Sequence, residues 1–230
     1  MAKRTVLRLV YLLMSLPMIA VAILCYLFNF GNVRTYYKQC INAVHANNKT
    51  YSQELIQCLY IGEDKRGLSH LGVDYIGIFR AILSILRGQL QGASTIEQQF
   101  VRTVVGRYER TLTRKWLEQL LSHLVCLRLT KRQVAESYLS IGFFGANMQG
   151  VPALFDRLAP TSYDLSFYAG VIARLKYPQP KRKSQVWATK HLNRTTWIMR
   201  QYKSTNKELK TEPGFGSKYR SSKTGIYKSE

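Results

Sequence analysis

Residues 92–100 read GASTIEQQF, a short polar start followed by an apolar helical pattern. Ser94 and Glu97 have the S-x-x-E spacing of a capping box, in which each side chain satisfies a free backbone N–H. Apolar residues then recur at helical spacing, which predicts one amphipathic helix over about 95–105. The stretch is either only a capped helix start or also the wall of a substrate site. Three polar side chains are predicted to lie off the apolar stripe: Gln98, Gln99 and Arg102.

The rest of the chain has the same helical character. With 230 residues, 46% of them hydrophobic, it is long enough for one domain with a substantial core. Helical periodicity recurs between about 51 and 180, and no segment shows sustained β alternation. A second capping box, Thr130 with Gln133, begins another helix. The sequence therefore predicts a mainly α fold, with residues 31–50 as a polar connector.

The net charge and the N-terminus restrict the possible partners. A formal net charge of +21 favours nucleic acid, anionic lipid or a phosphorylated substrate. Residues 9–30 contain no charged side chain, which suits a membrane-spanning helix, and bulky residues stand where a signal peptide would be cleaved. Because Lys3, Arg4 and Arg8 precede this stretch, we expect an uncleaved anchor with its N-terminus in the cytoplasm and the remainder outside.

Cysteine and histidine spacing indicates no metal site. The chain has four residues of each type, without a C-x-x-C pair or an H-E-x-x-H motif. Cys25 lies in the expected anchor, and Cys126 lies on an apolar helix face. Cys40 and Cys58 either pair in an oxidising compartment or remain reduced.

Two acidic residues are candidates for chemistry. Glu63 follows an apolar run, where it is either a carboxylate over a cleft or an ordinary turn acid. Glu118 lies at the margin of an apolar helix face, with Arg114 and Lys115 four and three residues before it. Glu118 either forms a surface ion pair or is a cleft-edge carboxylate balanced by two cations.

Four motifs stand in order along the chain. Residues 62–72, GEDKRGLSHLG, contain E-D-x-x-F-x-x-H-x-G without its aromatic, and residues 92–99, GASTIEQQ, match G-x-S-T-I-x-Q-Q. Residues 114–118, RKWLE, match R-K-x-x-E, and residues 131–140, KRQVAESYLS, match K-x-x-x-x-E-x-Y-L-N except at the last position. In this order and spacing the chain resembles the peptidoglycan glycosyltransferase family (glycosyltransferase family 51), in its monofunctional, membrane-anchored form. GVIARLKYPQP, residues 170–180, is similar to the family's closing motif.

The resemblance implies a lysozyme-like helical glycosyltransferase domain behind one transmembrane helix. Residues 1–30 would be the anchor and 31–180 the glycosyltransferase domain. Residues 181–230 lose the apolar period and are rich in Lys, Ser and Thr, which predicts a basic C-terminal extension of one or two helices that fade into a disordered tail. The family joins the disaccharide units of lipid II into glycan strands, with inversion at the anomeric carbon, a new β-1,4 bond and a lipid diphosphate leaving group.

The resemblance also implies roles for individual residues. By motif match, Glu63 is the base that deprotonates the acceptor hydroxyl, and Glu118 is the second carboxylate, near the departing diphosphate. Arg102, Arg114 and Lys115 would face the phosphates. The other substrate-binding residues implied by the motifs are Asp64, His70, Ser94, Thr95, Gln98 and Gln99.

Some positions depart from the family. Gly67 replaces the aromatic of the first motif, Ser140 replaces asparagine in the fourth, and Phe167 and Tyr168 stand where the family usually has a glutamate. These departures affect the expected catalytic efficiency more than the expected fold. We expect Gly67 to weaken packing around the glycosyl donor. No S-x-x-K motif occurs, so we expect a polymeriser that does not cross-link.

The resemblance completes the expectations. It implies a single-pass protein of the bacterial cytoplasmic membrane with its catalytic domain on the periplasmic, outer side. Its partners would be lipid II, the growing glycan chain, membrane lipids and other cell-wall synthesis proteins, without nucleic acid. No cofactor is required, although Mg²⁺ or Mn²⁺ could assist at the diphosphate.

Three alternative functions remain at this stage. A lytic transglycosylase shares the fold but needs no diphosphate-binding cations, so the presence of Arg102, Arg114 and Lys115 disfavours this alternative. A degenerate, non-catalytic membrane scaffold is compatible with Gly67. A basic nucleic-acid binder would explain the charge but not the anchor.

Overall fold

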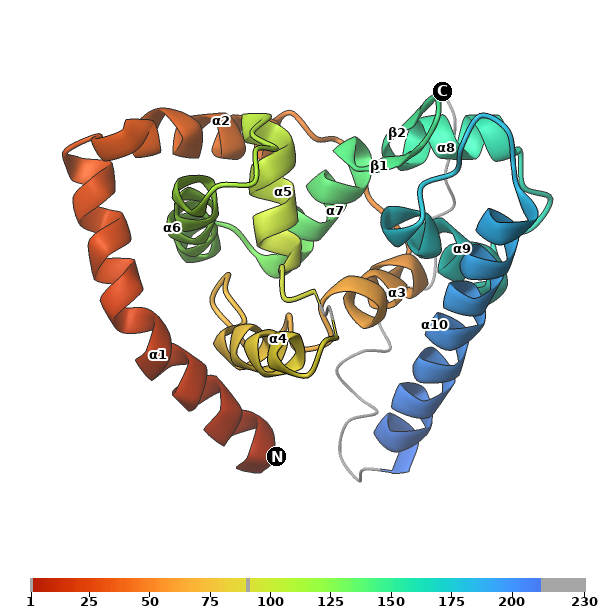
Figure 1. Ribbon diagram of the computed structural model, residues 1–230, viewed down its shortest axis with the longest axis horizontal. Helices are drawn as coiled ribbons and strands as arrows, with labels where there is room; N and C mark the ends of the chain where they lie inside the picture. Colours follow the sequence, from red (N-terminus) through yellow and green to blue (C-terminus); the bar gives the residue numbers. More distant parts are fainter. Residues whose placement is uncertain (1, 90–91, 212–230) are drawn as a thin grey trace. The chain divides into compact units, whose positions relative to one another are not determined.

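The computed structural model describes residues 2–89 and 92–211, with the side chains of 5–89 and 92–207 (Figure 1). The chain divides into two compact units, Met1–Lys49 with Glu63–Gly142, and Thr50–Gly62 with the chain from Phe143 onward. The elements of unit 1 are α1 (Ala2–Leu27), the 3₁₀ helix η1 (Phe30–Asn32), α2 (Val33–His45), α4 (Tyr75–Leu86), α5 (Ile96–Val105), α6 (Leu112–Arg128) and α7 (Lys131–Ile141). Those of unit 2 are α3 (Gln53–Glu63, whose last residue belongs to unit 1), β1 (Phe143–Gly145), β2 (Met148–Gln149), α8 (Gly150–Leu158), α9 (Leu165–Lys176) and α10 (Gln185–Thr211).

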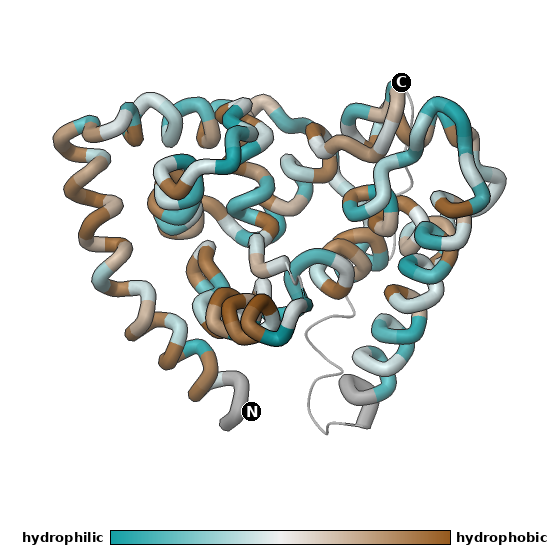
Figure 2. Tube along the Cα trace, in the orientation of Figure 1, coloured by the Kyte–Doolittle hydropathy of each residue, from teal (hydrophilic) through white to brown (hydrophobic). Residues whose placement is uncertain are grey.

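The predicted mainly α fold with one N-terminal apolar helix is confirmed. Within α1, the segment Thr5–Leu27 is long and apolar enough to cross a membrane, which fits an N-terminal membrane anchor. Figure 2 shows hydrophobic residues along most of its length. Pro17 lies inside this helix without ending it.

The core of unit 1 forms around α5, which packs against both α6 and α7 (Figure 1). Ile96, Phe100 and Val101 form the buried stripe of α5, at the spacing of a single helix face. The helices that pack on α5 contribute fully buried apolar residues such as Leu121 of α6 and Leu139 of α7. This packing fixes the helices that carry the second, third and fourth motifs.

The predicted capping box of Ser94 and Glu97 is wrong, because the N-cap of α5 lies one residue further along the chain. Thr95 is the N-cap: its Oγ1 accepts from the N–H of Gln98 at 3.2 Å, and Gln98 Oε1 accepts from the N–H of Thr95 at 3.2 Å. The Thr95 hydroxyl also donates to the carbonyl of Gly72 at 2.7 Å. This tertiary contact favours Thr95 over Ser94 as the cap. The Thr130–Gln133 box at α7 is confirmed.

The connector predicted over residues 31–50 is wrong, because most of it is helix α2. Val33, Cys40 and Val44 are its buried residues, and α2 packs on α5 and α6. Their spacing of seven and four residues is helical, but the polar composition of the stretch concealed this pattern. All four cysteines lie in the described part of the chain and are free thiols, and Cys40 and Cys58 are both buried.

Unit 2 is built on α9 and α10, which pack along one another (Figure 1). Gly62 near the end of α3 allows close approach, since a Cβ there would lie 2.6 Å from Ile172 of α9. The short strands β1 and β2 form an antiparallel pair that sequence alternation did not predict, because five residues are too few for a pattern. The predicted basic helix in residues 181–230 is α10, and the tail after Thr211 lies outside the described residues.

Candidate active site

Glu63 and Asp64 stand where α3 ends and a loop begins. Asp64 is buried, and each of its carboxylate oxygens lies 3.1 Å from Nε2 of His70. Its Oδ2 also accepts from the backbone N–H of Ile96, the first residue of α5, at 3.2 Å. Asp64 therefore ties the first motif to the second, and this bond restrains the position of the half-buried Glu63 beside it.

Gln99 connects Glu63 to α7. Its Nε2 donates to Glu63 Oε2 at 3.4 Å, and its Oε1 accepts from the hydroxyl of Tyr138 at 2.6 Å. Burial, together with the negative charge of Glu63, raises the pKa of Tyr138 above its ordinary value. The phenol therefore remains a donor, which fixes the direction of the Gln99 amide and turns its N–H toward Glu63.

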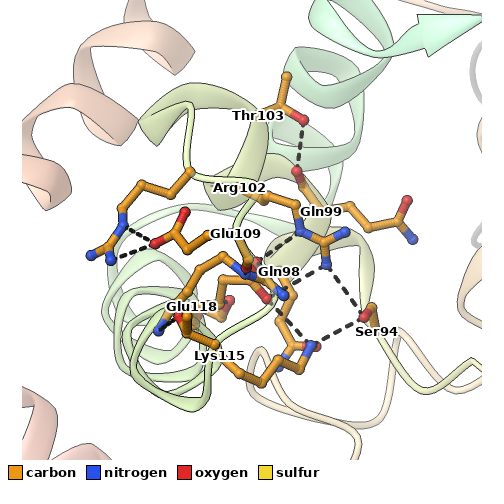
Figure 3. Close-up of polar contacts among 12 residues, drawn as sticks. Ser94, Gln98, Gln99, Arg102, Thr103, Glu109, Lys115 and Glu118 are labelled. Atoms are coloured by element: carbon orange, nitrogen blue, oxygen red, sulfur yellow. Dashed lines mark hydrogen bonds and ion pairs between the residues drawn. The ribbon is translucent and has the colours of Figure 1, made fainter.

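Glu118 is surrounded by three cations (Figure 3). Arg102 Nε donates to its Oε1 at 2.7 Å, Arg114 Nη1 donates to the same oxygen, and Lys115 Nζ lies 3.3 Å from its Oε2. Only 2% of Glu118 is exposed. Burial lowers the pKa of Lys115, although Glu118 acts in the opposite direction. Three positive charges on one carboxylate leave a net positive site.

Ser94 and Gln98 extend this cationic cluster toward the start of α5. Ser94 Oγ accepts from Lys115 Nζ at 3.1 Å and from Arg102 Nη2 at 3.5 Å (Figure 3). Gln98 is fully buried, because its side chain closes the helix cap. Its Oε1 also lies 3.4 Å from Lys115 Nζ. Within the described residues, its Nε2 has no hydrogen-bond partner.

An open pocket brings the first and second motifs together. It is polar and mixed in charge, with acids and bases interleaved along its wall. Its lining residues are Glu63, Asp64, Lys65, Arg66, Asp74, Arg80, Gly92, Ala93, Ser94 and Thr95.

The sequence matches a known family. The sequence fits the model of a family described as Transglycosylase over residues 31–201. The chain belongs to the peptidoglycan glycosyltransferase family. Its sequence is also similar to that of several penicillin-binding proteins.

These relatives are much longer than the matched segment. Penicillin-binding protein 1B of Haemophilus influenzae is 39% identical over 101 residues, which cover 43% of this chain and 13% of that protein. Penicillin-binding protein 1A of Escherichia coli (strain K12) is 40% identical over 102 residues, covering 44% and 12%. Penicillin-binding protein 4 of Bacillus subtilis is 34% identical over 101 residues, covering 43% and 16%. The matches thus concern the glycosyltransferase segment and a small share of each relative.

Two positions of unit 1 that depart from the family motifs are Gly67 and Ser140. Gly67 is buried in a tight turn, where its N–H donates to the carbonyl of Asp64 at 2.8 Å, and its φ is not positive. Ser140 Oγ lies 2.9 Å from Oδ1 of Asn47 and 3.0 Å from the carbonyl of Glu136. The side-chain amide of Asn47, just after α2, therefore lies beside the position where the family motif has its own asparagine.

Asp64, His70 and Glu97 are the residue types that could hold a metal ion, with ligand atoms within 4.8 Å of one another. Lys131 Nζ lies 2.7 Å from Glu97 Oε1 and 3.4 Å from His70 Nδ1. The ammonium group of Lys131 therefore stands among these groups, where an added metal ion would meet a positive charge.

An exposed apolar face lies on α4, next to the pocket wall. Figure 2 shows this helix as mostly hydrophobic. Asp74 caps it by accepting from the N–H of Gly77 at 2.8 Å, and it also binds Arg66 Nη2 at 2.6 Å and the hydroxyl of Tyr11 from α1. Burial alone would raise the pKa of Asp74, but these three bonds lower it overall. The exposed apolar side chains are Phe79, Ile82, Leu83, Ile85 and Leu86.

The structure gathers the predicted site residues into two connected groups. Glu63, Asp64, His70, Thr95 and Gln99 meet around the end of α3 and the start of α5. The cationic cluster around Glu118 contains the rest: Ser94, Gln98, Arg102, Arg114 and Lys115.

Several contacting residues were not predicted as site residues. Tyr138 and Lys131 belong to the fourth motif, so the motif match could have indicated them. Arg66 in the pocket wall and Glu97 in the buried charge cluster occupy positions that the motifs leave open, and Asp74 lies just after the first motif. No local signal distinguishes these three residues.

Proposed function

We propose that this protein is a peptidoglycan glycosyltransferase that polymerises lipid II into glycan strands. The single observation that carries the proposal is the buried Glu118 with Arg102, Arg114 and Lys115 around it. A site that cuts glycan strands has no diphosphate to neutralise, whereas a lipid diphosphate leaving group needs several cations. Family membership supports the same reaction class.

Glu63 is the proposed base. It takes the proton from the acceptor's 4-hydroxyl as that oxygen forms the new bond to the donor's anomeric carbon. On the opposite face of this carbon, the bond to the diphosphate oxygen breaks, so the configuration inverts. The Gln99 amide, held by Tyr138, orients the Glu63 carboxylate for this proton transfer.

The cationic cluster is the proposed diphosphate site. Negative charge develops on the departing oxygen, and Arg102, Arg114 and Lys115 stabilise it best in the transition state. Glu118 positions the three cations and keeps them from repelling one another. Gln98 Nε2, a buried donor without a partner in the described chain, can bind a sugar or phosphate oxygen.

We propose that no resident cofactor is needed. Asp64 and Asp74, two carboxylates of the pocket wall, are engaged by His70 and Arg66 respectively. A divalent cation, Mg²⁺ or Mn²⁺, would then act by accompanying the substrate diphosphate rather than through a set of protein ligands. Metal analysis of the purified, dialysed protein tests this point: one tightly bound divalent ion per chain would contradict it.

The proposed location is the bacterial cytoplasmic membrane, with a single pass and the catalytic residues on the outer, periplasmic side. The positive flank before α1 supports this orientation. The exposed apolar face of α4 supports contact with lipid. The proposed partners are lipid II, the growing glycan chain, membrane lipids and other cell-wall synthesis proteins, and not nucleic acid.

Incubation of the purified full chain in detergent with labelled lipid II tests the function. Polymerisation should give long glycan strands, which a muramidase then digests. Unchanged lipid II would contradict the proposal and favour a non-catalytic scaffold. A parallel incubation with preformed strands should leave them intact, since shortening would indicate a lytic transglycosylase.

A further inference from the structure

Glu97 is a buried acid that the proposed reaction does not use. It occupies the open position of G-x-S-T-I-x-Q-Q, so the motif does not require an acid there. Its exposed fraction is 0%. A buried carboxylate is costly unless it is paired, so the fold must provide a partner for it.

The partner comes from the start of a different helix. Lys131, the first residue of α7, donates to Glu97 Oε1 at 2.7 Å. Burial alone would raise the pKa of Glu97, but the charge of Lys131 lowers it overall. Burial alone would lower the pKa of Lys131, yet Glu97 raises it overall. Both groups therefore remain charged at neutral pH and form a buried ion pair.

Lys131 also reaches the first motif. Its Nζ lies 3.4 Å from Nδ1 of His70. Because an ammonium group can only donate, Nδ1 must accept, and the ring proton must then be on Nε2. From Nε2 this proton is donated to Asp64, 3.1 Å away. One direction of donation thus runs from Lys131 through His70 to Asp64.

We propose that the Glu97–Lys131 ion pair is a positioning device that fixes the Nε2–H tautomer of His70 and, through Asp64, the placement of Glu63. Glu97 holds the ammonium group of Lys131 beside Nδ1 of His70, so both residues are needed to fix the tautomer. Asp64 can then accept from both His70 and Ile96, which keeps the Glu63 backbone close to the helix that carries Gln99. This proposal depends on the proposed function only for its predicted effect on turnover.

The decisive variant replaces both charges at once. Lys131→Met alone leaves a buried carboxylate without its partner, so it should lower the melting temperature as well as turnover. In Glu97→Gln with Lys131→Met, a neutral pair of similar volume removes that penalty, and the melting temperature should return toward that of the parent protein. Turnover should stay down by roughly 10-fold to 100-fold, the scale for losing a group that orients a functional side chain.

A spectroscopic measurement separates positioning from stability. In the full chain labelled with ¹⁵N-histidine, two-bond ¹H–¹⁵N correlation spectra report which ring nitrogen of His70 carries the proton, with His70→Gln for assignment. We expect the Nε2–H form in the parent and a mixture, or the Nδ1–H form, in the double variant. Lys131→Arg, which keeps a donor, should retain the Nε2–H form. Lys38→Met, on the exposed side of α2, is the matched control and should change neither readout.

Each outcome decides the inference. A double variant with restored melting temperature, altered tautomer and low turnover supports it. A double variant with full turnover, or an unchanged His70 tautomer, would overturn it and leave a purely structural ion pair. If the parent protein makes no glycan, the proposed function fails, and the tautomer measurement alone still decides whether Glu97 and Lys131 fix His70.

Discussion

The two carboxylates of the site have opposite surroundings. Glu63 is half-buried at a helix end and receives a hydrogen bond from a neutral amide, Gln99. Glu118 is buried in the middle of α6 and contacts Arg102, Arg114 and Lys115 (Figure 3). The amide of Gln99 orients Glu63 without adding a positive charge, whereas Glu118 gathers three positive charges at one point.

The difference between Glu63 and Glu118 shows how one fold can give two carboxylates different roles. Acid and base functions in a single site are assigned by environment rather than by residue type. In this protein the separation depends on α5, which carries Gln99 toward Glu63 and Arg102 toward Glu118 from positions three residues apart. Substitutions at Glu63 and in the cationic cluster should therefore have distinguishable kinetic effects.

The largest expected effect is at Glu63. Glu63→Gln removes the proton acceptor without loss of volume, so turnover should fall by about 10²–10⁴ while the melting temperature is retained. Glycan synthesis from lipid II and thermal unfolding followed by circular dichroism measure the two quantities. Glu54→Gln, an exposed acid in the first turn of α3, is the control and should remain active. Retention of more than half of the parental turnover by Glu63→Gln would remove Glu63 from the mechanism.

A smaller loss is expected on the cationic side. Arg114→Ala should lower kcat as well as substrate binding, by roughly 10²-fold, because charge on the diphosphate develops in the transition state. Steady-state kinetics on lipid II in detergent measure both parameters. Arg107→Ala is matched, since Arg107 forms a more exposed pair with Glu109 at 2.6 Å. Equal, small effects from the two variants would mean that Arg114 only pairs on the surface.

The orientation of Glu63 should matter less than its presence. Tyr138→Phe removes the 2.6 Å bond that fixes the Gln99 amide, and the net value of one such bond corresponds to a rate loss of roughly threefold to tenfold. Single-turnover rates at saturating lipid II would show it. A loss as large as that from Glu63→Gln would indicate that the phenol itself takes part in proton transfer.

The smallest effect concerns pH. Because burial lowers the pKa of Lys115, this cation should be lost as pH rises toward the ordinary value of 10.5, and kcat/KM should begin to fall below that pH. Lys115→Arg keeps the charge at alkaline pH, so the alkaline limb of the profile, where kcat/KM falls, should shift to higher pH. The value of kcat/KM near neutral pH should change little. Profiles of kcat/KM against pH for the two proteins provide the test. An identical alkaline limb in both would assign the limb to another group.

The motifs predicted which side chains would meet, because local spacing determines those contacts. Arg114 and Lys115 reach Glu118 across one turn of α6, as their spacing indicated. Ser94 and Arg102 join the same cluster through the packing of α5 on α6, which the order of the motifs implied but their spacing did not.

Contacts between distant positions could not be predicted from the sequence. Glu97 and Lys131 are 34 residues apart, and Glu97 had a plausible local role as a capping residue. The bond from Thr95 to the carbonyl of Gly72 shifted the cap by one residue and left Glu97 to be buried. Helix α2 was missed for a different reason, since its buried residues recur at helical spacing but stand in a stretch of polar composition.

The bond between Tyr11 and Asp74 joins α1 to the cap of α4. Sixteen residues separate Tyr11 from Leu27 at the end of α1, which is about 24 Å at 1.5 Å per residue. Because the hydrocarbon core of a bilayer is about 30 Å thick, an α1 that spans it with Leu27 at the outer surface would draw Asp74, and the pocket wall with it, deep into the membrane. A membrane-spanning α1 and a pocket on the outer side therefore require this bond to open. Asp74 would then keep Arg66 and the N–H of Gly77 as partners, so the cap of α4 does not depend on the anchor.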